Sequence, residues 1–250
     1  MIAKRGLHHL LALLLVLAGC GTGDVSDPDV EREVQGGQQA TLTPEASIDE
    51  DALVEAEDEP ASARFELGVH YQRLSPTQPT SSSPEQVEVA EVFWYGCPHC
   101  NDFEPYLARW LARKSSAIAF VRIPAMWNDL LRLHARAYYT AEALGKLDEM
   151  HSAFFAEIHE RGNPLDSRGA LERFFGRFGV TPDEFAEAFD SYAVHTKVQR
   201  AEELARRYRI TSVPSIVVNG KYTSNATLAG SYDALIELID ELAESERPQR

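Results

Sequence analysis

Cysteine is scarce in this chain, which has three cysteines in 250 residues. One of them, Cys20, lies near the N-terminus, and the other two are Cys97 and Cys100 in the tetrapeptide Cys-Pro-His-Cys. This number excludes the framework of several disulfides that stabilises small secreted domains. Two cysteines separated by two residues can instead form a disulfide with each other, and such a pair usually carries out redox chemistry. The sequence therefore indicates an enzyme that makes or breaks disulfides.

Long hydrophobic runs are also missing. The apolar run at residues 10–18, which follows a basic N-terminus, has roughly half the residues that a membrane-spanning helix needs. A basic start before a short apolar core is typical of a secretory signal. The letters LAGC that end at Cys20 resemble a bacterial lipobox, in which the chain is cleaved before a cysteine that becomes lipidated. We expect a lipoprotein signal peptide at residues 1–19 and a lipidated Cys20; an ordinary signal peptide with an incidental cysteine is the alternative.

Basic residues are few, because 24 Lys and Arg stand against 39 Asp and Glu, a formal net charge of −15. Much of the acidic excess lies in residues 21–61, which hold a single arginine and no aromatic residue. Such a segment cannot bury enough apolar surface to fold, so we expect residues 20–62 to be the lipidated cysteine and an acidic disordered linker. A solubilising segment without a partner is the simpler interpretation. No basic stretch interleaved with aromatic residues indicates nucleic-acid binding.

The remaining residues, 63–250, are enough for one sizeable domain. Their apolar pattern predicts a strand at 68–74 and, after a turn-rich stretch, a strand at 87–95 that ends just before the cysteine pair. A helix at 101–114 and another strand at 117–124 follow. A helix that crosses between two strands implies that these strands are parallel.

Strand signals then stop, and apolar residues recur at helical spacing. This spacing predicts four helices with Gly or Pro between them, at residues 130–144, 147–160, 167–178 and 182–208. Strand character returns around Asn219-Gly220, and Asn-Gly between two strands is a strong hairpin signal. An amphipathic helix at 232–244 completes the order β-α-β, helical block, β-β-α.

This order, with Cys-Pro-His-Cys after a strand and Val213-Pro214 ahead of the hairpin, resembles the DsbA-type thiol:disulfide oxidoreductases, thioredoxin-fold proteins of the bacterial cell envelope. The resemblance covers residues 65–244. It implies an α/β protein with a thioredoxin fold and a mixed central sheet. An all-helical domain is expected to be inserted at residues 128–209 of a domain that spans residues 63–250.

The residues of the motif favour a stable thiolate at Cys97. If Cys97 caps the helix, Pro98 occupies its first turn, where the missing N–H costs nothing, and free N–H groups point toward the Cys97 sulfur. A charged or hydrogen-bonding His99 adds to this preference. A stable thiolate is a good leaving group, so its disulfide passes readily to a substrate. Cys100, one helical turn further on, is expected to be the less exposed thiol and to resolve mixed disulfides.

Three further residues are candidates for the site. The thioredoxin family pattern has a cis-proline beside the cysteine pair, which implies that Pro214 is cis and that Val213 contacts the substrate chain. A trans proline that begins the strand is the alternative. Glu91 interrupts an apolar strand, where a carboxylate is costly unless solvated, paired or protonated. A raised pKa would suit Glu91 to relay protons for Cys100, and the DsbA pattern has a glutamate at this spacing; an edge-exposed structural residue is the alternative.

A zinc knuckle is the competing interpretation of the cysteine pair. A structural zinc site needs about four ligands, and no second Cys-X-X-Cys exists in the chain. The histidines of the predicted helical block, His134, His151, His159 and His195, are scattered and are interpreted as ordinary helix-face residues. We expect neither a metal nor a cofactor.

The sequence predicts a periplasm-facing, lipid-anchored monomer that donates a Cys97–Cys100 disulfide to newly exported proteins that contain cysteine. The resemblance implies reoxidation by a DsbB-like, quinone-linked membrane protein. Gly21 after the lipidated cysteine favours sorting to the outer membrane. Two alternatives stay open: an envelope reductase or isomerase with the same fold, and a non-catalytic lipoprotein that binds unfolded chains.

Overall fold

The computed structural model describes residues 64–247. The predicted signal peptide at residues 1–19, Cys20 and the predicted linker at residues 20–62 lie outside the described residues. Among the helices of the described range, none is both long and apolar enough to cross a membrane.

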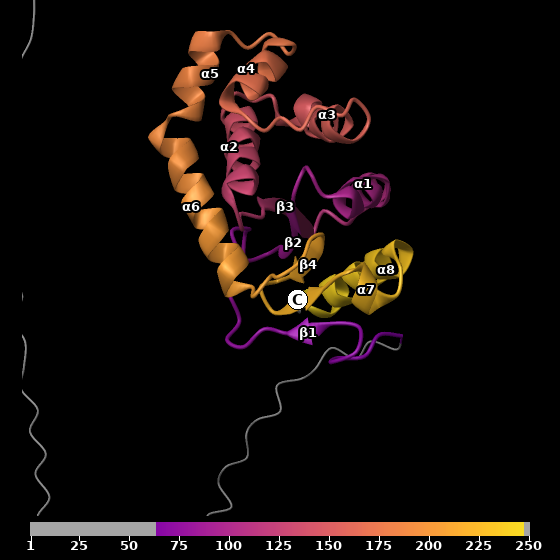
Figure 1. Cartoon of the computed structure of the whole chain (residues 1–250). Coiled ribbons are helices and arrows are strands. Elements are labelled where there is room, and N and C mark those ends of the chain that lie inside the picture. The colour runs from indigo at the N-terminus through magenta and orange to yellow at the C-terminus, as the bar shows by residue number, and fades with distance from the viewer. Residues whose placement is uncertain (1–63, 248–250) are drawn as a thin grey trace, which may run out of the picture. The chain divides into compact units, whose positions relative to one another are not determined.

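A five-stranded mixed sheet forms the centre of the fold, in the order β1-β5-β4-β2-β3 (Figure 1). The strands are β1 (Gln72–Arg73), β2 (Val87–Phe93), β3 (Ile118–Pro124), β4 (Ser215–Val218) and β5 (Tyr222–Ser224). β2 and β3 are parallel, as a crossover helix requires, whereas β4 pairs antiparallel with both β2 and β5. The predicted α/β architecture with a mixed central sheet is confirmed.

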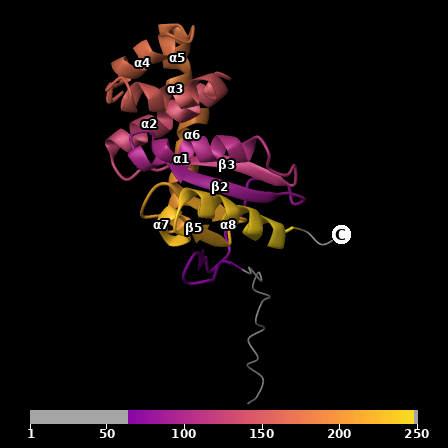
Figure 2. The same cartoon turned by 90° about the vertical axis from the view of Figure 1, so that its right-hand side faces the viewer.

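Helices cover both faces of this sheet. Those of the described residues are α1 (Pro98–Leu111), α2 (Asp129–Ala143), α3 (Leu147–His159), α4 (Arg168–Gly176), α5 (Pro182–Phe189), α6 (Tyr192–Arg207), α7 (Ala226–Ala229) and α8 (Tyr232–Ser245). α2 to α6 follow one another between β3 and β4 and make up the helical part of the molecule, in the upper half of Figure 1. α1, α7 and α8 lie on one face of the sheet, the face that is turned toward the viewer in Figure 2.

β2 is buried along its whole length because each of its faces packs against helices. Successive strand residues point to opposite faces of a sheet. Val87 and Val89 accordingly pack in one core with residues of α1 and α8. Ala90 and Val92 pack in another core with residues of α2 and α6. A polar side chain on β2 therefore lies in the interior of the protein.

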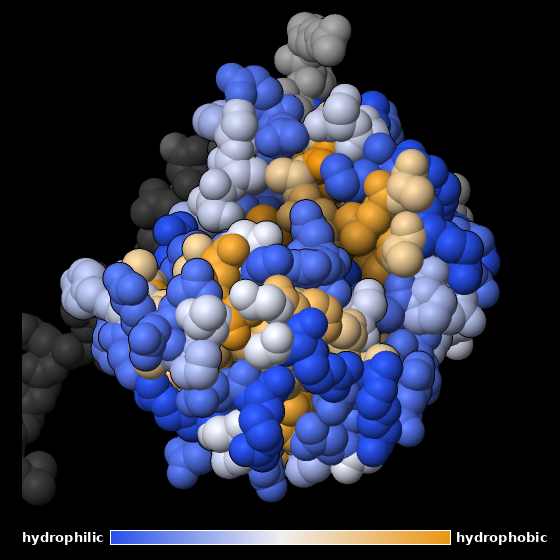
Figure 3. Space-filling view, turned by 90° about the horizontal axis from the view of Figure 1, so that it is seen from above, coloured by the Kyte–Doolittle hydropathy of each residue, from blue (hydrophilic) through white to orange (hydrophobic). Residues whose placement is uncertain are grey.

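The helical part has a core of its own that is rich in aromatic rings. Its buried phenylalanines include Phe154, Phe174, Phe175, Phe185 and Phe189, and the ring centroids of Phe154 and Phe174 are 4.5 Å apart. Seen from above, the outer surface is mostly hydrophilic, and hydrophobic residues gather in hollows between the charged ones (Figure 3). The aromatic side chains thus hold the helices together from inside.

Two predicted elements have different bounds in the structure. The single helix predicted at 182–208 is wrong, because the chain breaks between α5 and α6. Ser191 caps α6, and its side chain accepts a hydrogen bond from the Val194 N–H at 3.2 Å. A capping box at Thr181 and Glu184 begins α5. The strand predicted at 68–74 is reduced to the two residues of β1.

The predicted hairpin between β4 and β5 is confirmed. Asn219 and Gly220 both have positive φ, 50° and 63°, as the two central residues of a type I′ turn require. A Cβ on Gly220 would lie 2.1 Å from the backbone oxygen of Gln78. Glycine is therefore required here by the approach of a neighbouring loop as well as by the turn.

Candidate active site

The cysteine pair lies where β2 ends and α1 begins. Cys97 is the N-cap of α1 with an extended backbone (φ −84°, ψ 118°), and Pro98 takes the first helical position. Proline suits that position because an N–H there would have no partner within the helix. Cys97 is 8% exposed, whereas Cys100 is completely buried, and both are free thiols. A substrate sulfur can therefore reach Cys97 but not Cys100.

The surroundings of Cys97 stabilise its thiolate. They lower the pKa of Cys97 to about 6, mainly through a hydrogen bond from the Cys100 thiol. The backbone N–H groups of Cys100 and His99 and the charge of His99 act in the same direction, and burial opposes them. Backbone N–H groups at the start of a helix have no carbonyl partner and attract negative charge. Cys97 is therefore mostly a thiolate at neutral pH.

The surroundings of Cys100 disfavour its thiolate, in contrast to those of Cys97. Burial raises the pKa of Cys100, and the hydrogen bond to Cys97 and the charge of Glu91 raise it further. Cys100 consequently keeps its proton under conditions in which Cys97 has lost its own. The two sulfurs are one helical turn apart and suited to different tasks.

Glu91 lies in the middle of β2 and is completely buried. Its register partner on β3 is Arg122, and Arg122 Nε donates to Glu91 Oε2 at 3.1 Å. The other oxygen, Oε1, has no hydrogen-bond partner within the described part of the chain. Burial raises the pKa of Glu91, while the charge of Arg122 lowers it. A half-paired carboxyl whose charge acts on Cys100 is suited to exchange a proton with that thiol.

A second carboxylate shares Arg122. Arg122 Nη2 donates to both oxygens of Glu104 on α1, at 3.2 and 3.3 Å. Burial alone would raise the pKa of Glu104, but His151 and Arg122 outweigh it and leave this pKa below its usual value. Sequence reasoning missed Arg122 and Glu104. An arginine inside an apolar strand next to that of Glu91 is the signal that could have found the first of them.

The loop before β4 lies beside the cysteine pair. The peptide bond between Val213 and Pro214 is cis. Cys97 Sγ lies 3.5 Å from the carbonyl oxygen of Val213, 116 residues away in the chain. The side chain of His99 is exposed, and its backbone carbonyl accepts a hydrogen bond from the Tyr232 hydroxyl at 3.0 Å. This bond ties the first turn of α1 to α8.

The interpretation of the four histidines is wrong for three of them. His134, His151 and His159 each make a hydrogen bond to the segment Trp94–Tyr95, which leads from β2 to Cys97. His195 is exposed on α6. Helical spacing assigns a residue to a face but does not say what that face packs against, so the pattern could not reveal these bonds. Over the described chain, no group of three or more His, Cys, Asp or Glu side chains is placed to hold a metal ion.

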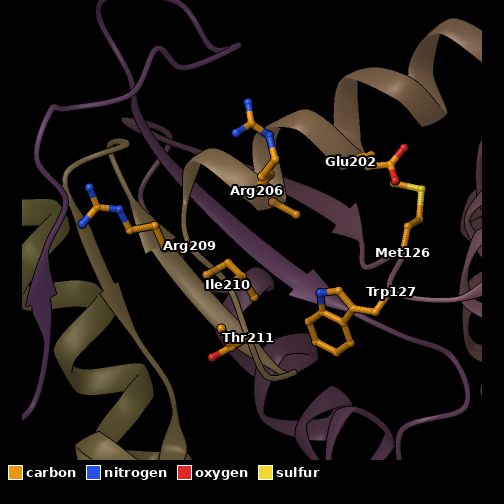
Figure 4. A pocket seen from close by; sticks show the side chains of 8 residues that line it. Met126, Trp127, Glu202, Arg206, Arg209, Ile210 and Thr211 are labelled. Carbon is orange, nitrogen blue, oxygen red and sulfur yellow. The ribbon is translucent and has the colours of Figure 1, made fainter. Parts of the chain in front are cut away.

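A cavity of about 570 Å³ opens between the end of α6 and the connection from β3 to α2 (Figure 4). Its walls include Trp127, which is half exposed, together with Ile210 and Arg206. Thr211 also lines the cavity and lies two residues before Val213. The cavity and Cys97 therefore adjoin the same loop. Nothing in the sequence predicts it, because its walls come from two distant segments.

Comparison with known proteins places the chain among disulfide-exchange proteins. It matches the family described as "DSBA-like thioredoxin domain" over residues 106–237. It is 36% identical over 187 residues to the thiol:disulfide interchange protein DsbA of Pseudomonas syringae pv. tomato, covering 75% of this chain and 87% of the relative. The DsbA of Azotobacter vinelandii is 36% identical over 185 residues, or 74% of this chain and 86% of the relative.

Solved structures agree with these relatives. The crystal structure of Pseudomonas aeruginosa DsbA has a TM-score of 0.70 at 35% identity and covers 73% of this chain and 95% of its own. That of the oxidoreductase DsbA from Xylella fastidiosa has a TM-score of 0.67 at 31% identity, with 71% and 95% covered. The predicted thioredoxin fold and the predicted likeness to DsbA are both confirmed, and the chain belongs to the DSBA-like thioredoxin domain family, the DsbA-type thiol:disulfide oxidoreductases.

Proposed function

We propose that this chain oxidises thiols of exported proteins in the bacterial cell envelope, and that the group it donates is a disulfide between Cys97 and Cys100. The observation that carries the proposal is the opposite effect of the site on the two thiols. A thiolate is stabilised at Cys97, and a neutral thiol is stabilised at Cys100. A site that stabilises the reduced pair in this way makes the corresponding disulfide a strong oxidant.

The proposed reaction consists of two thiol–disulfide exchanges. A client thiolate attacks the Cys97 sulfur, the bond between the two enzyme sulfurs breaks, and Cys100 leaves as a thiolate that takes up a proton. A second client thiolate then attacks the client sulfur of this mixed disulfide, and Cys97 leaves as a thiolate. The client dithiol loses two electrons and two protons and becomes a disulfide. The enzyme pair gains the two electrons, its Cys100 gains one proton, and the second proton goes to the solvent.

Glu91 is proposed as the source of that proton. Its carboxyl is buried and holds a proton more strongly than an exposed glutamate, and its charge acts on Cys100. When Cys100 leaves as a buried thiolate, a proton transferred from Glu91 neutralises the Cys100 sulfur. The negative charge then lies on the Glu91 carboxylate, to which Arg122 Nε donates a hydrogen bond at 3.1 Å. The exchange therefore avoids leaving an unpaired charge at Cys100.

The client chain is proposed to run along the loop that contains Val213. This backbone lies within 3.5 Å of the sulfur that the client attacks, so the residues beside the client cysteine must pass it. Thr211 leads from Val213 to the cavity of Figure 4, whose walls include the apolar side chains of Trp127 and Ile210. An apolar client side chain near the cysteine fits this cavity.

The cellular setting is proposed from the residues outside the described range. Cleavage after residue 19 and lipidation of Cys20 would anchor the protein to a membrane, facing the periplasm, with residues 20–62 as a tether. Gly21 favours the outer membrane. The protein would act as a monomer, without a cofactor or metal of its own, and a DsbB-like, quinone-linked membrane protein would reoxidise it.

Trapping of mixed disulfides tests the reaction. In Cys100→Ala the Cys97 thiolate can attack a disulfide that a client holds in an oxidising envelope, which breaks that bond and joins the client to Cys97. No Cys100 thiol is present to break the mixed disulfide, so client proteins should accumulate bound to Cys97. These complexes should be visible on a non-reducing gel and absent in Cys97→Ala. If no complex forms, the non-catalytic binding protein is favoured.

Equilibration of the cysteine pair with glutathione separates an oxidase from a reductase. The low pKa of Cys97 stabilises the reduced pair, so glutathione should reduce the enzyme disulfide readily. A potential close to that of thioredoxin would overturn the proposed direction and favour the reductase or isomerase.

A further inference from the structure

Three residues, Trp94, Tyr95 and Gly96, connect the end of β2 to Cys97. The backbone N–H of Cys97 donates to the carbonyl oxygen of Trp94 at 3.0 Å. The indole ring of Trp94 folds over Gly96 so closely that a Cβ there would lie 2.3 Å from it. A shift of Trp94 or Tyr95 is therefore passed directly to Cys97.

His134 on α2 holds the first of these residues. The indole Nε1–H of Trp94 donates to His134 Nδ1 at 3.0 Å, and the two rings are stacked. His134 Nε2 lies 3.1 Å from the carbonyl oxygen of Pro164, which can only accept. The proton therefore sits on Nε2, and Nδ1 is free to accept from Trp94. Burial, which leaves His134 only 2% exposed, lowers its pKa and keeps this neutral form.

His151 on α3 holds the side chain of the second residue. The Tyr95 hydroxyl lies 2.9 Å from His151 Nδ1, and His151 Nε2 lies 3.2 Å from Glu104 Oε1. A carboxylate accepts, so Nε2 carries the proton and Nδ1 accepts from the hydroxyl. Burial lowers the pKa of His151, against the effect of Glu104. Arg122 also binds Glu104, so this histidine is linked through Glu104 and Arg122 to Glu91.

His159, the last residue of α3, holds the backbone. Its Nε2 lies 2.8 Å from the carbonyl oxygen of Tyr95 and donates to it. The Tyr95 ring is also stacked on Phe154 of the same helix, with centroids 4.5 Å apart. Figure 1 shows α3 directly above α1, so these bonds reach from the helical part to the residues just before Cys97.

We propose that His134, His151 and His159 are positioning residues for disulfide donation. They fix the segment Trp94–Tyr95, hold the Cys97 sulfur against the N–H groups at the start of α1, and so let the helical part of the molecule set the redox equilibrium of the cysteine pair. This inference rests on the proposed role of the pair as the donated disulfide. If the bonds are lost, the sulfur is free to move from those N–H groups and the thiolate loses stabilisation.

A pair of substitutions at His159 tests this inference. His159 is partly exposed at the end of α3, so replacing it should leave the fold intact. His159→Leu removes the donor to Tyr95, whereas His159→Gln keeps an N–H donor of similar reach. Exposed His195, on α6, provides the matched control His195→Leu. Tyr95→Phe is a second, independent variant that removes the hydroxyl and keeps the ring.

The measurements are the equilibrium constant with glutathione and the thiolate titration of Cys97. His159→Leu and Tyr95→Phe should each make the pair less oxidising by about threefold or more, equivalent to a rise of about half a unit in the thiolate pKa. His159→Gln and His195→Leu should resemble the unchanged protein. Equal constants for all variants would overturn the proposed positioning role. If instead the unchanged protein fails to oxidise glutathione, or Cys100→Ala fails to trap clients, it is the proposed function that fails.

Discussion

The two cysteines lie three residues apart at the start of α1, yet their surroundings shift the pKa values of the two thiols in opposite directions. Cys97 stands before the first helical residue, where unpaired N–H groups and the Cys100 thiol favour a thiolate. Cys100 lies inside the first turn, is completely buried, and is held neutral. Three residues along the helix are therefore enough to make Cys97 a stable thiolate and Cys100 a protonated thiol.

The pH dependence of the reduced protein follows from this difference. The ultraviolet absorbance of the Cys97 thiolate should titrate with a midpoint near pH 6. Because the folded pKa lies below that of an unfolded cysteine, the reduced form gains stability that is complete above the unfolded pKa and is lost as pH falls through about 6. The oxidising strength should decline over the same window. Cys97→Ser should abolish the absorbance step, and a midpoint between pH 8 and 9, about that of free cysteine, would contradict the assignment.

Replacing the buried carboxyl tests its proposed part in proton transfer. Glu91→Gln keeps the size of the side chain and an acceptor for Arg122 but cannot give up a proton to Cys100. The rate of disulfide donation should fall on the order of a hundredfold, the scale of general acid–base catalysis. Stopped-flow fluorescence with a reduced peptide client measures this rate.

Glu88 on the same strand provides the control for this rate. It is also buried, but its carboxylate binds the Ser81 and Ser82 backbone N–H groups, at 2.7 and 3.0 Å. Glu88→Gln should donate disulfides at the unchanged rate. Equal rates for Glu91→Gln and the unchanged protein at every pH would exclude proton transfer by Glu91.

Some helices and strands can be predicted from the local sequence of each, and others cannot. β2, α1 and the hairpin at Asn219 follow from local patterns, namely apolar runs, proline at a helix start and Asn-Gly. The break between α5 and α6 was missed because Ser191 caps a helix inside a stretch whose apolar spacing continues across it. Local patterns therefore predict that a helix exists more reliably than where it is interrupted.

The stability of α6 should depend on its cap. Ser191→Ala removes the side chain that accepts from the Val194 N–H, and such a loss should lower the free energy of unfolding by about 1 kcal/mol. Thr196, exposed on the same helix, gives the control Thr196→Ala, which should cost less because alanine favours a helix more than threonine does. Urea unfolding of the two variants measures the difference. Equal stabilities would show that the break is held by packing instead of the cap.

At the scale of the whole molecule, the active site is assembled from parts that are far apart in the chain. Cys97 could be identified from its motif, and Glu91 from its place in an apolar strand. Arg122 leaves a signal as an arginine in the neighbouring apolar strand, but Glu104 and the three positioning histidines could not be identified, because their roles depend on which helix face packs against which strand. The contacts between helix faces and strands are set by tertiary packing, which a pattern along one sequence does not show.

The acidic segment before the domain is proposed to act in the cell and not in the chemistry of the site. Residues 21–61 lie outside the described residues, and a flexible chain of that length would span on the order of 35 Å. If it serves to place the enzyme within reach of a membrane-bound partner or client, its length should matter in cells and not in solution. The isolated enzyme should then oxidise a peptide equally well with or without it.

Deleting residues 21–61 while keeping Cys20 should therefore reduce disulfide formation in exported proteins, as measured by thiol alkylation of a periplasmic client in intact cells. A Gly-Ser segment of equal length should restore it, because the proposed role requires reach and not acidic charge. Peptide oxidation by the three purified proteins should be the same, which separates a tether from a part of the active site. Full activity in cells after the deletion would leave the segment as a solubilising stretch, without a part in bringing Cys97 to its partners.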